Sequence, residues 1–193
     1  MIFTDEALAQ HLNGKIISLR SHHGKYVAAE ASGHANANRA RVGPWEKFRV
    51  ELVSGNRIAL KSVAHNRYLV AESNGQANAN RVHRGPWEIF RLMKVSDRRF
   101  ALRSHHGKYL VAESNGHLNA NRVHRGPWEL FDFDFPQGKK DFPRSYWTKI
   151  VLVKILSSEG FPKGNFFIIL ALVLPFIYQN ELDLEVKEAF SRA

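Results

Sequence analysis

The sequence contains no cysteine among its 193 residues. A disulfide framework, a thiolate zinc site and a cysteine nucleophile are therefore excluded. It also has no Asn-X-Ser/Thr sequon, which disfavours a glycosylated secreted protein. No serine-nucleophile motif, phosphate-cradling glycine loop or metalloprotease helix occurs. These absences leave no positive case for an enzyme, and we expect neither a cofactor nor a bound metal ion.

The first residues carry no recognisable targeting signal. The stretch MIFTDEALAQHL has acidic residues and no long apolar run, so it does not read as a signal peptide, and Ile2 excludes N-myristoylation, which needs glycine there. We therefore expect the protein in the cytoplasm. Thr4 as an N-cap, followed by two acidic residues, predicts a short helix over residues 4–12, within a lead-in of residues 1–14.

One segment of about 25 residues occurs three times in this chain, with small differences. It reads GKYVAAEASGHANANRARVGPWEKF at 24–48, NRYLVAESNGQANANRVHRGPWEIF at 66–90 and GKYLVAESNGHLNANRVHRGPWELF at 107–131. The tryptophans and the tyrosines both step by 42 and then 41 residues. Each copy alternates short strand patterns with turn signals, and no helical period appears inside it. In the first copy the expected strands cover residues 15–20, 26–29, 34–38 and 45–52.

Four strands in each of three repeats predict an all-β chain and match a β-trefoil over residues 15–135. In that fold six strands close a barrel and six form hairpins over one end, and closure removes free sheet edges. Equivalent apolar positions should supply the core, with Trp and Phe burying the most area. We expect these core positions to be Leu19, Leu60 and Leu102, Trp45, Trp87 and Trp128, and Phe48, Phe90 and Phe131.

Residues 136–193 break this pattern. A Pro- and Gly-containing linker leads to the apolar segment Trp147–Leu156, a 13-residue apolar run at Phe166–Tyr178 and a partly amphipathic helical pattern at Glu181–Phe190. The run is shorter than the roughly 17–25 residues of a membrane-spanning helix. We favour packing against the trefoil, a partner chain or itself. Membrane insertion and a tail without evolved structure are the alternatives, and an oligomer could form through this extension.

The formal net charge of +10 belongs entirely to the repeat region. Residues 15–135 contain 20 Lys and Arg against 10 Asp and Glu, whereas the rest of the chain contains 8 of each. Nine of the ten histidines also lie in this region, and histidines gain charge as pH falls through about 6.5. A field of this sign favours acidic partners, such as polyanionic filaments, nucleic acid or anionic lipid surfaces. The simpler interpretation is a soluble domain with a high isoelectric point.

Two histidine pairs, His22-His23 and His105-His106, precede Gly-Lys-Tyr at equivalent places. Zinc would need three or four converging ligands, whereas adjacent side chains on a strand point to opposite faces, so metal binding is disfavoured. A solvated turn with titrating histidines is the simpler interpretation. A pH-sensitive attachment to an acidic surface would use the same residues.

An Asn-x-Asn-Arg element in each copy is followed by a basic loop before Gly-Pro-Trp. The first copy has Val42 where the others have arginine, so we expect the second and third copies to contribute more to binding. Arginine presents a rigid fork that suits carboxylates. The candidate partner-binding residues from the turns and loops are His22, His23, Lys25, Arg39, Arg41, Arg81, His83, Arg84, His105, His106, Lys108, Arg122, His124 and Arg125.

Two glutamate positions also recur in every copy. Paired carboxylates can act as general acid and base, but an active site is normally a single asymmetric constellation. We therefore predict salt bridges within each repeat. The glutamates are Glu30, Glu72 and Glu113, and Glu46, Glu88 and Glu129.

The segments SHHGKYVAAE and SHHGKYLVAES, each followed by a Gly turn, an Asn-x-Asn strand and GPWE with an aromatic residue, resemble the fascin-like repeat. The His-His-Gly-Lys-Tyr turn is similar to the hisactophilin-like members of the same actin-crosslinking family. The resemblance covers residues 15–135. It implies a β-trefoil, no catalytic activity, binding to actin filaments and a cytoskeletal location, with pH-sensitive binding at membranes in the hisactophilin-like case.

The leading hypothesis is therefore a non-enzymatic module that binds actin filaments through basic, histidine-rich loops. A single trefoil would bundle filaments only as an oligomer or with a second site. The alternatives are a carbohydrate-binding trefoil, although no Gln-x-Trp signature occurs, and binding to an anionic lipid surface. Nucleic acid is not expected, because the aromatic residues that would stack on bases are assigned to the core.

Overall fold

The computed structural model describes residues 4–96 and 99–136. The segments expected after residue 136 lie outside the described residues. Within residues 4–96 and 99–136 the chain is all-β, as predicted, apart from one short helix and two single 3-10 turns. The elements in chain order are α1 (Asp5–Leu12), β1 (Ile16–Ser21), β2 (Tyr26–Ala29), β3 (Ala35–Arg39), β4 (Phe48–Ser54), β5 (Arg57–Ser62), β6 (Tyr68–Ala71), β7 (Ala77–Arg81), η1 (Pro86–Glu88), β8 (Ile89–Lys94), β9 (Arg99–Arg103), β10 (Tyr109–Ala112), β11 (Leu118–Arg122), η2 (Pro127–Glu129) and β12 (Phe131–Asp134).

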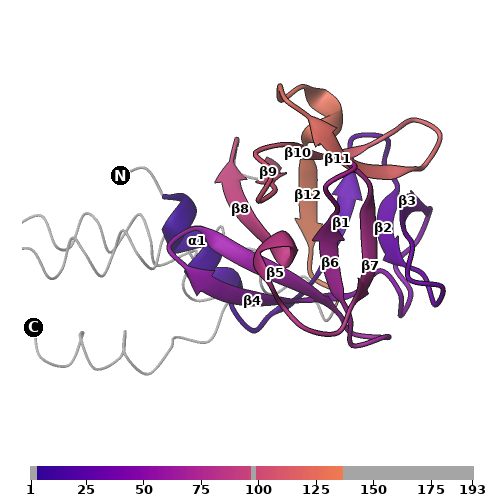
Figure 1. The fold of residues 1–193 in the computed structure, drawn as a ribbon, viewed down its shortest axis with the longest axis horizontal. Coiled ribbons are helices and arrows are strands. Elements are labelled where there is room, and N and C mark those ends of the chain that lie inside the picture. Colours follow the sequence, from indigo (N-terminus) through magenta and orange to yellow (C-terminus); the bar gives the residue numbers. More distant parts are fainter. Residues whose placement is uncertain (1–3, 97–98, 137–193) are drawn as a thin grey trace, which may run out of the picture. The chain divides into compact units, whose positions relative to one another are not determined.

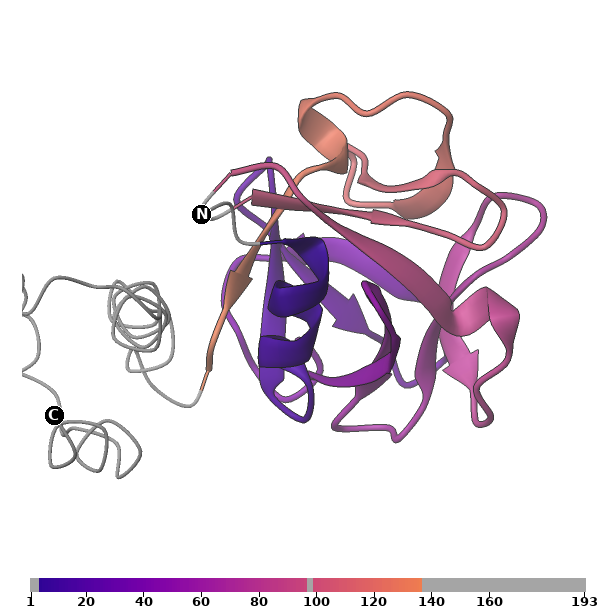
Figure 2. The ribbon, with the colours of Figure 1, turned by 90° about the vertical axis from the view of Figure 1, so that its left-hand side faces the viewer.

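The predicted N-terminal helix is confirmed as α1, which lies across strands of the sheet (Figure 2). Thr4 Oγ1 accepts the N–H of Ala7 at 3.2 Å, which satisfies one of the free donors of the first turn. Leu8, Ala9 and Leu12 form its buried face. Asp5 Oδ1 accepts the N–H of Lys94 at 2.8 Å and so ties the helix to β8. No helix among the described residues is long and apolar enough to cross a membrane.

Six strands form a ring through antiparallel pairs. β1 pairs with β12 and β4, β5 pairs with β4 and β8, and β9 pairs with β8 and β12. Every strand of the ring therefore has a hydrogen-bonded neighbour on both sides, which protects its edges from other chains. The other six strands form the hairpins β2–β3, β6–β7 and β10–β11 (Figure 1).

Equivalent backbone hydrogen bonds join the three hairpins to one another. In each contact the carbonyl of a turn glycine accepts the N–H of an alanine in another hairpin at 2.8 Å. The pairs are Gly33 with Ala79, Gly75 with Ala120, and Gly116 with Ala37. Each hairpin donates one such bond and accepts one, so the contacts form a closed cycle.

These three turns require glycine for two reasons. Gly33, Gly75 and Gly116 have φ values of 94°, 87° and 87°, a region that L side chains rarely adopt. A Cβ added at Gly75 would also lie 2.9 Å from the Cβ of Asn121, which belongs to the neighbouring hairpin. The hairpins can therefore approach closely only because these positions lack a side chain.

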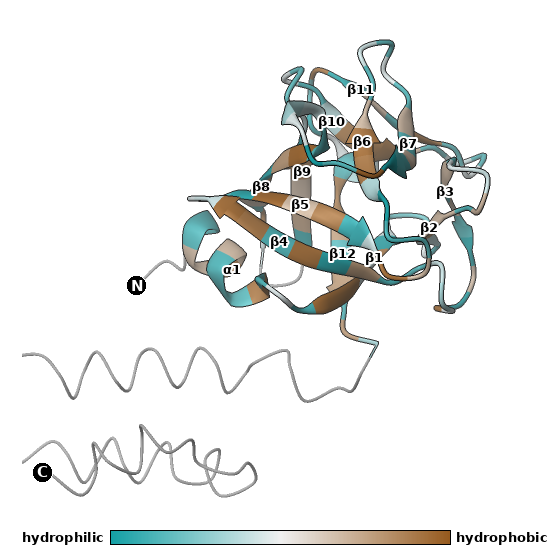
Figure 3. Ribbon diagram, turned by 60° about the horizontal axis from the view of Figure 1, so that its bottom comes forward, coloured by the Kyte–Doolittle hydropathy of each residue, from teal (hydrophilic) through white to brown (hydrophobic). Residues whose placement is uncertain are grey.

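The predicted leucine and phenylalanine core is confirmed. Phe48, Phe90 and Phe131 are at most 1% exposed, and the leucines at the expected positions are fully buried. Burying one such side chain stabilises the fold by about 1.5–3 kcal/mol. Apolar and polar residues alternate along the first five residues of β4 (Figure 3), so one face of that strand supplies the core, whereas Ile58, Ala59 and Leu60 of β5 are buried in succession.

The prediction that the tryptophans belong to the core is wrong. Trp45 and Trp128 are 37% exposed and Trp87 is half-buried. The preceding Gly-Pro places each tryptophan in a turn, and in the second and third copies this turn is η1 or η2. The strand β4 accordingly begins at Phe48 and not at Trp45. Because a turn does not follow strand alternation, the tryptophan leaves the core face.

We predict that Gly75→Ala destabilises the domain more than Gly14→Ala does. Both glycines have positive φ, which costs an alanine about 1–2 kcal/mol. Only Gly75 adds the close approach to Asn121, because nothing lies within 4 Å of a Cβ at Gly14. Overpacking adds about 1–3 kcal/mol. Urea unfolding of both variants measures the difference, and equal losses of stability would show that the hairpin contact is not tight.

Candidate functional site

Three of the candidate arginines are used by the fold. Arg39, Arg81 and Arg122 end strands β3, β7 and β11, and each lies between the two glutamates of its own copy. The Nη2 atoms lie 2.6, 2.9 and 2.9 Å from carboxylate oxygens of Glu30, Glu72 and Glu113. The Nε atoms lie 3.7, 3.7 and 3.8 Å from Glu46, Glu88 and Glu129. The predicted salt bridges within each repeat are thus confirmed.

The second glutamate of each pair also closes the loop before it. Glu46, Glu88 and Glu129 are 4–5% exposed. In each, Oε2 accepts the backbone N–H of the glycine three residues earlier at 2.6 Å. A bond between a backbone donor and a carboxylate is short and strong. The Asn-x-Asn-Arg arginines therefore fix the basic loops in place and are only partly free to bind a partner.

The inner histidine of each turn packs on a tryptophan from another copy. His23 lies edge-to-face on Trp128 and His106 on Trp87, with ring centroids 5.0 Å apart in both cases. In the second copy His65, which the sequence analysis did not single out, lies 5.6 Å from Trp45. The second copy has one extra residue in this turn and no His-His pair. The sequence therefore does not show that His65 is equivalent to His23 and His106.

These three ring contacts bring each turn beside the basic loop of the preceding copy in cyclic order. Nε2 of His23, His65 and His106 is buried and has no hydrogen-bond partner among the residues that the structure describes. The outer histidines, His22 and His105, are exposed beside them. The candidate histidine pairs therefore divide into a packing residue and a solvent-facing residue.

Most of the candidate residues fall in two groups, each made of a turn and the loop whose tryptophan the inner histidine of that turn contacts. One group joins the first turn to the loop that ends at Trp128, and the other joins the third turn to the loop that ends at Trp87. The first comprises His22, His23, Lys25, His124 and Arg125, and the second His105, His106, Lys108, His83 and Arg84. The second turn has no lysine or histidine pair, and Arg41 of the first loop is the exposed cation at its junction.

The loop arginines differ in their partners. Arg84 Nη1 lies 2.9 Å from Glu51 Oε2, and the same carboxylate accepts the Tyr68 hydroxyl at 2.9 Å. Arg125 has no ion pair in the described part of the chain, because β8 offers no acidic residue at the place equivalent to Glu51. The first loop has Val42 at this position. Of the two loop arginines, only Arg125 lacks an ion pair among the described residues.

Sequence reasoning missed the carboxylates that bind the tyrosines. Asp134 Oδ2 accepts the hydroxyl of Tyr26 at 2.6 Å, and Glu51 accepts that of Tyr68. This hydrogen bond, together with burial, raises the pKa of Tyr26, while burial and then the bond to Glu51 raise the pKa of Tyr68. Neither carboxylate is repeated in all copies, so the threefold pattern gave no signal for them.

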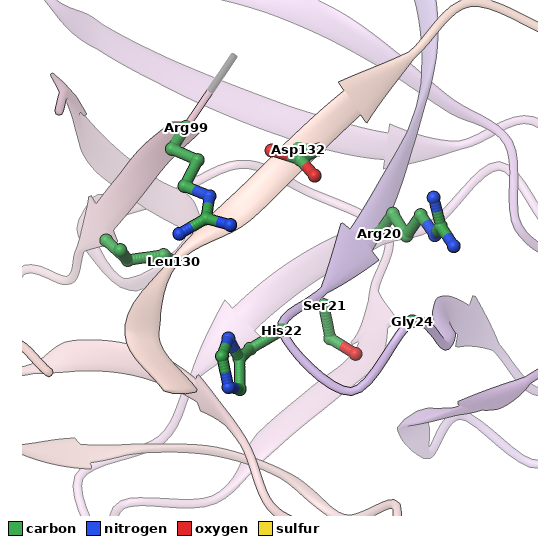
Figure 4. Close-up of a pocket in the computed structure, with 7 residues that line it drawn as sticks. All are labelled: Arg20, Ser21, His22, Gly24, Arg99, Leu130 and Asp132. Carbon is green, nitrogen blue, oxygen red and sulfur yellow. The ribbon is translucent and has the colours of Figure 1, made fainter. Parts of the chain in front are cut away.

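A pocket of about 210 Å³ lies where β1, β9 and β12 meet. Figure 4 shows Asp132 on β12 between Arg99 on β9 and Arg20 on β1, with His22 at the adjacent turn. His22 is the only candidate residue that lines it. Within residues 4–96 and 99–136, no group of three or more His, Asp or Glu side chains is arranged to hold a metal ion.

We predict that Arg122→Ala lowers the free energy of unfolding by about 1–2 kcal/mol, because it leaves the buried Glu129 carboxylate without its cation. The figure is modest because solvent screens the 44% exposed arginine. Arg125→Ala should change stability by less than about 0.5 kcal/mol. Thermal or urea unfolding separates the two variants. A large loss in Arg125→Ala would mean that this arginine is also structural.

We predict that stability falls as pH rises above about 10, the ordinary pKa of tyrosine in an unfolded chain. Folding raises the pKa of Tyr26 and Tyr68, so the unfolded chain releases these protons first and gains stability relative to the folded state. Urea unfolding between pH 8.5 and about 11 measures the slope. The double variant Tyr26→Phe/Tyr68→Phe should show a flatter slope, and an unchanged slope would contradict the role of these hydroxyls.

Comparison with known protein families gives a match over part of the chain. A family model described as a domain of unknown function, DUF7910, matches residues 49–141. The matched stretch contains the second and third copies of the repeated segment and leaves out the first, which ends at residue 48. No curated protein matches the chain.

Proposed function

We propose that residues 15–135 form a β-trefoil. The ring of six strands and the three separate hairpins support this proposal. The cyclic glycine–alanine contacts relate the hairpins in the manner expected of three equivalent units. The same cyclic order appears in the histidine–tryptophan contacts.

We further propose that this domain is a non-enzymatic module that binds filamentous actin in the cytoplasm. The observation that carries the proposal is that the turns bearing the fascin-like resemblance also present unpaired cations. Lys25, Arg41, Lys108 and Arg125 are exposed and have no ion pair among the described residues. Arg81 and its equivalents form ion pairs within the domain. The four exposed cations form none among the described residues and are available to an acidic filament.

Histidines at the same junctions would add positive charge as the pH falls. His22, His83, His105 and His124 are exposed in the same turns and loops. The glutamates that follow the basic loops, Glu46, Glu88 and Glu129, already bind arginine and a backbone N–H, and Asp132 lines one pocket with His22. Protonation should therefore strengthen attachment to an acidic filament. Bundling by this single domain requires a second site or an oligomer formed through residues 136–193.

We predict that the full chain co-sediments with filamentous actin, more strongly at pH 6 than at pH 8 and less strongly at high salt. Lys25→Gln/Lys108→Gln should weaken binding severalfold, because it removes one free cation from each histidine turn. Arg49→Gln/Lys61→Gln is the control, since it removes the same charge from strands outside these turns.

Absence of pelleting at low salt and pH 6 would overturn the actin proposal. An equal loss in both double variants would show that net charge, and not the turns, governs binding. Pelleting with anionic vesicles but not with actin would instead favour the lipid-surface alternative.

A further inference from the structure

Three equivalent rows of side chains cross the outer surface of the ring, and each ends at a tyrosine. The residues of a row are direct cross-strand neighbours, so their side chains point to the same face. The first row is Arg99, Asp132, Arg20 and Tyr26. The second is Ile16, Arg49, Lys61 and Tyr68. The third is Arg57, Arg91, Arg103 and Tyr109.

The charges of the third row are not compensated within the row. The first row alternates in sign, with Asp132 between two arginines (Figure 4). The third row places three arginines side by side on β5, β8 and β9, which we call the arginine row. Like charges directly opposite one another destabilise a sheet. The arginine row is thus an arrangement that the fold itself does not favour.

The third row also lacks the carboxylate that binds the tyrosine in the other two. Asp134 lies opposite Ser18 and Glu51 opposite Ala59. Met93 lies at the same register, opposite Ala101. The Tyr109 hydroxyl accordingly has no hydrogen-bond partner within the described ranges, whereas Tyr26 and Tyr68 each donate to a carboxylate.

Arg125 belongs to the loop that faces this position without a carboxylate in the third row. It is separated from Arg122 by the same number of residues as Arg84 is from Arg81. The glycine after each loop arginine has φ −117° and ψ −164°, so the two loops share one conformation. Arg84 uses this conformation to bind Glu51. Arg125 therefore approaches the place where Met93 stands instead of a carboxylate.

The guanidinium groups around this position retain free donors. Arg91 and Arg125 have no ion pair among the residues described, and both are exposed. Arg103 donates one bond, from Nε to the carbonyl of Gly107 at 2.8 Å. Arg57 donates to the neutral hydroxyl of Ser54. Each of the four can still bind an anion.

We propose that the arginine row, with Tyr109 and Arg125, binds carboxylates of an acidic segment of another protein. The two equivalent positions bind a carboxylate of this chain with the same tyrosine, and in one case the same loop arginine, so a carboxylate is the matching ligand. Neighbouring strands lie about 4.8 Å apart. The arginine row therefore presents several cations within reach of two or three acidic side chains of one extended peptide.

This carboxylate site goes beyond the proposed function and does not require it. The probe is an acetylated, amidated hexaglutamate peptide added to the full chain, with binding measured by calorimetry at low salt. Met93→Glu should weaken peptide binding about tenfold or more, which is about 1.4 kcal/mol. It supplies internally the carboxylate that the site lacks, as Glu51 does in the second row. Arg91→Asp, which copies the arrangement at Asp132, should weaken it similarly.

Two matched variants distinguish loss of the carboxylate site from the effects of net charge and of side-chain shape. Met93→Gln should bind like the natural chain, because it changes shape without adding charge. Val63→Glu should also bind the peptide as the natural chain does, since this substitution adds the same charge at an exposed turn of the second copy. Circular dichroism checks that each variant is folded.

Three results would overturn the proposal. Met93→Glu could bind the peptide as the natural chain does, or Val63→Glu could lose as much affinity as Met93→Glu. Inorganic phosphate at equal concentration could displace the peptide, which would indicate a phosphate site. Because no reagent here contains actin, failure of this site and failure of the actin proposal are distinguishable.

Discussion

The close approach of the three hairpins is the constraint on which the rest of the structure depends. A glycine carbonyl of one hairpin accepts an alanine N–H of another, three times in a closed cycle. The glycines leave no room for a Cβ, since Asn38, Asn80 and Asn121 stand within about 3 Å of it. The arginine that ends each hairpin lies between two glutamates of its own copy. The position of the hairpin therefore also fixes the loop that follows. The turns and loops of different copies meet in the same cyclic order.

Within this frame, charged residues that look alike in sequence have different physical roles. Arg81 is bound by two carboxylates of its own copy, and Arg84 by one carboxylate of another strand. Arg125, three residues after an arginine of the first kind, has neither kind of partner in the described chain. Burial of the glutamates makes the first kind costly to remove, whereas a solvated arginine contributes little to folding. The surface available to partners is therefore smaller than the count of basic residues indicates.

Departures from the threefold pattern determine where charge is left uncompensated. Asp134, Glu51 and Met93 occupy one register, and Asp132, Arg49 and Arg91 occupy another. The first row contains an acid of its own between its two arginines, and the third contains none. Repetition thus supplies the scaffold, while single substitutions at equivalent positions give each face its own electrostatic character.

Much of the fold could be predicted from the sequence alone. The period of the repeat, the Gly and Pro turns and the alternation of apolar residues determined the strands, the buried Phe48, Phe90 and Phe131, and the helix capped by Thr4. That the recurring glutamates form salt bridges within each repeat also followed from their threefold recurrence, but their partners Arg39, Arg81 and Arg122 were expected to bind another molecule. Only the tertiary structure decided that the tryptophans leave the core, because a turn before each strand rotates them outward. It alone decided which cations are free, because the partner of an arginine comes from a different strand and depends on sheet register, which local sequence does not encode.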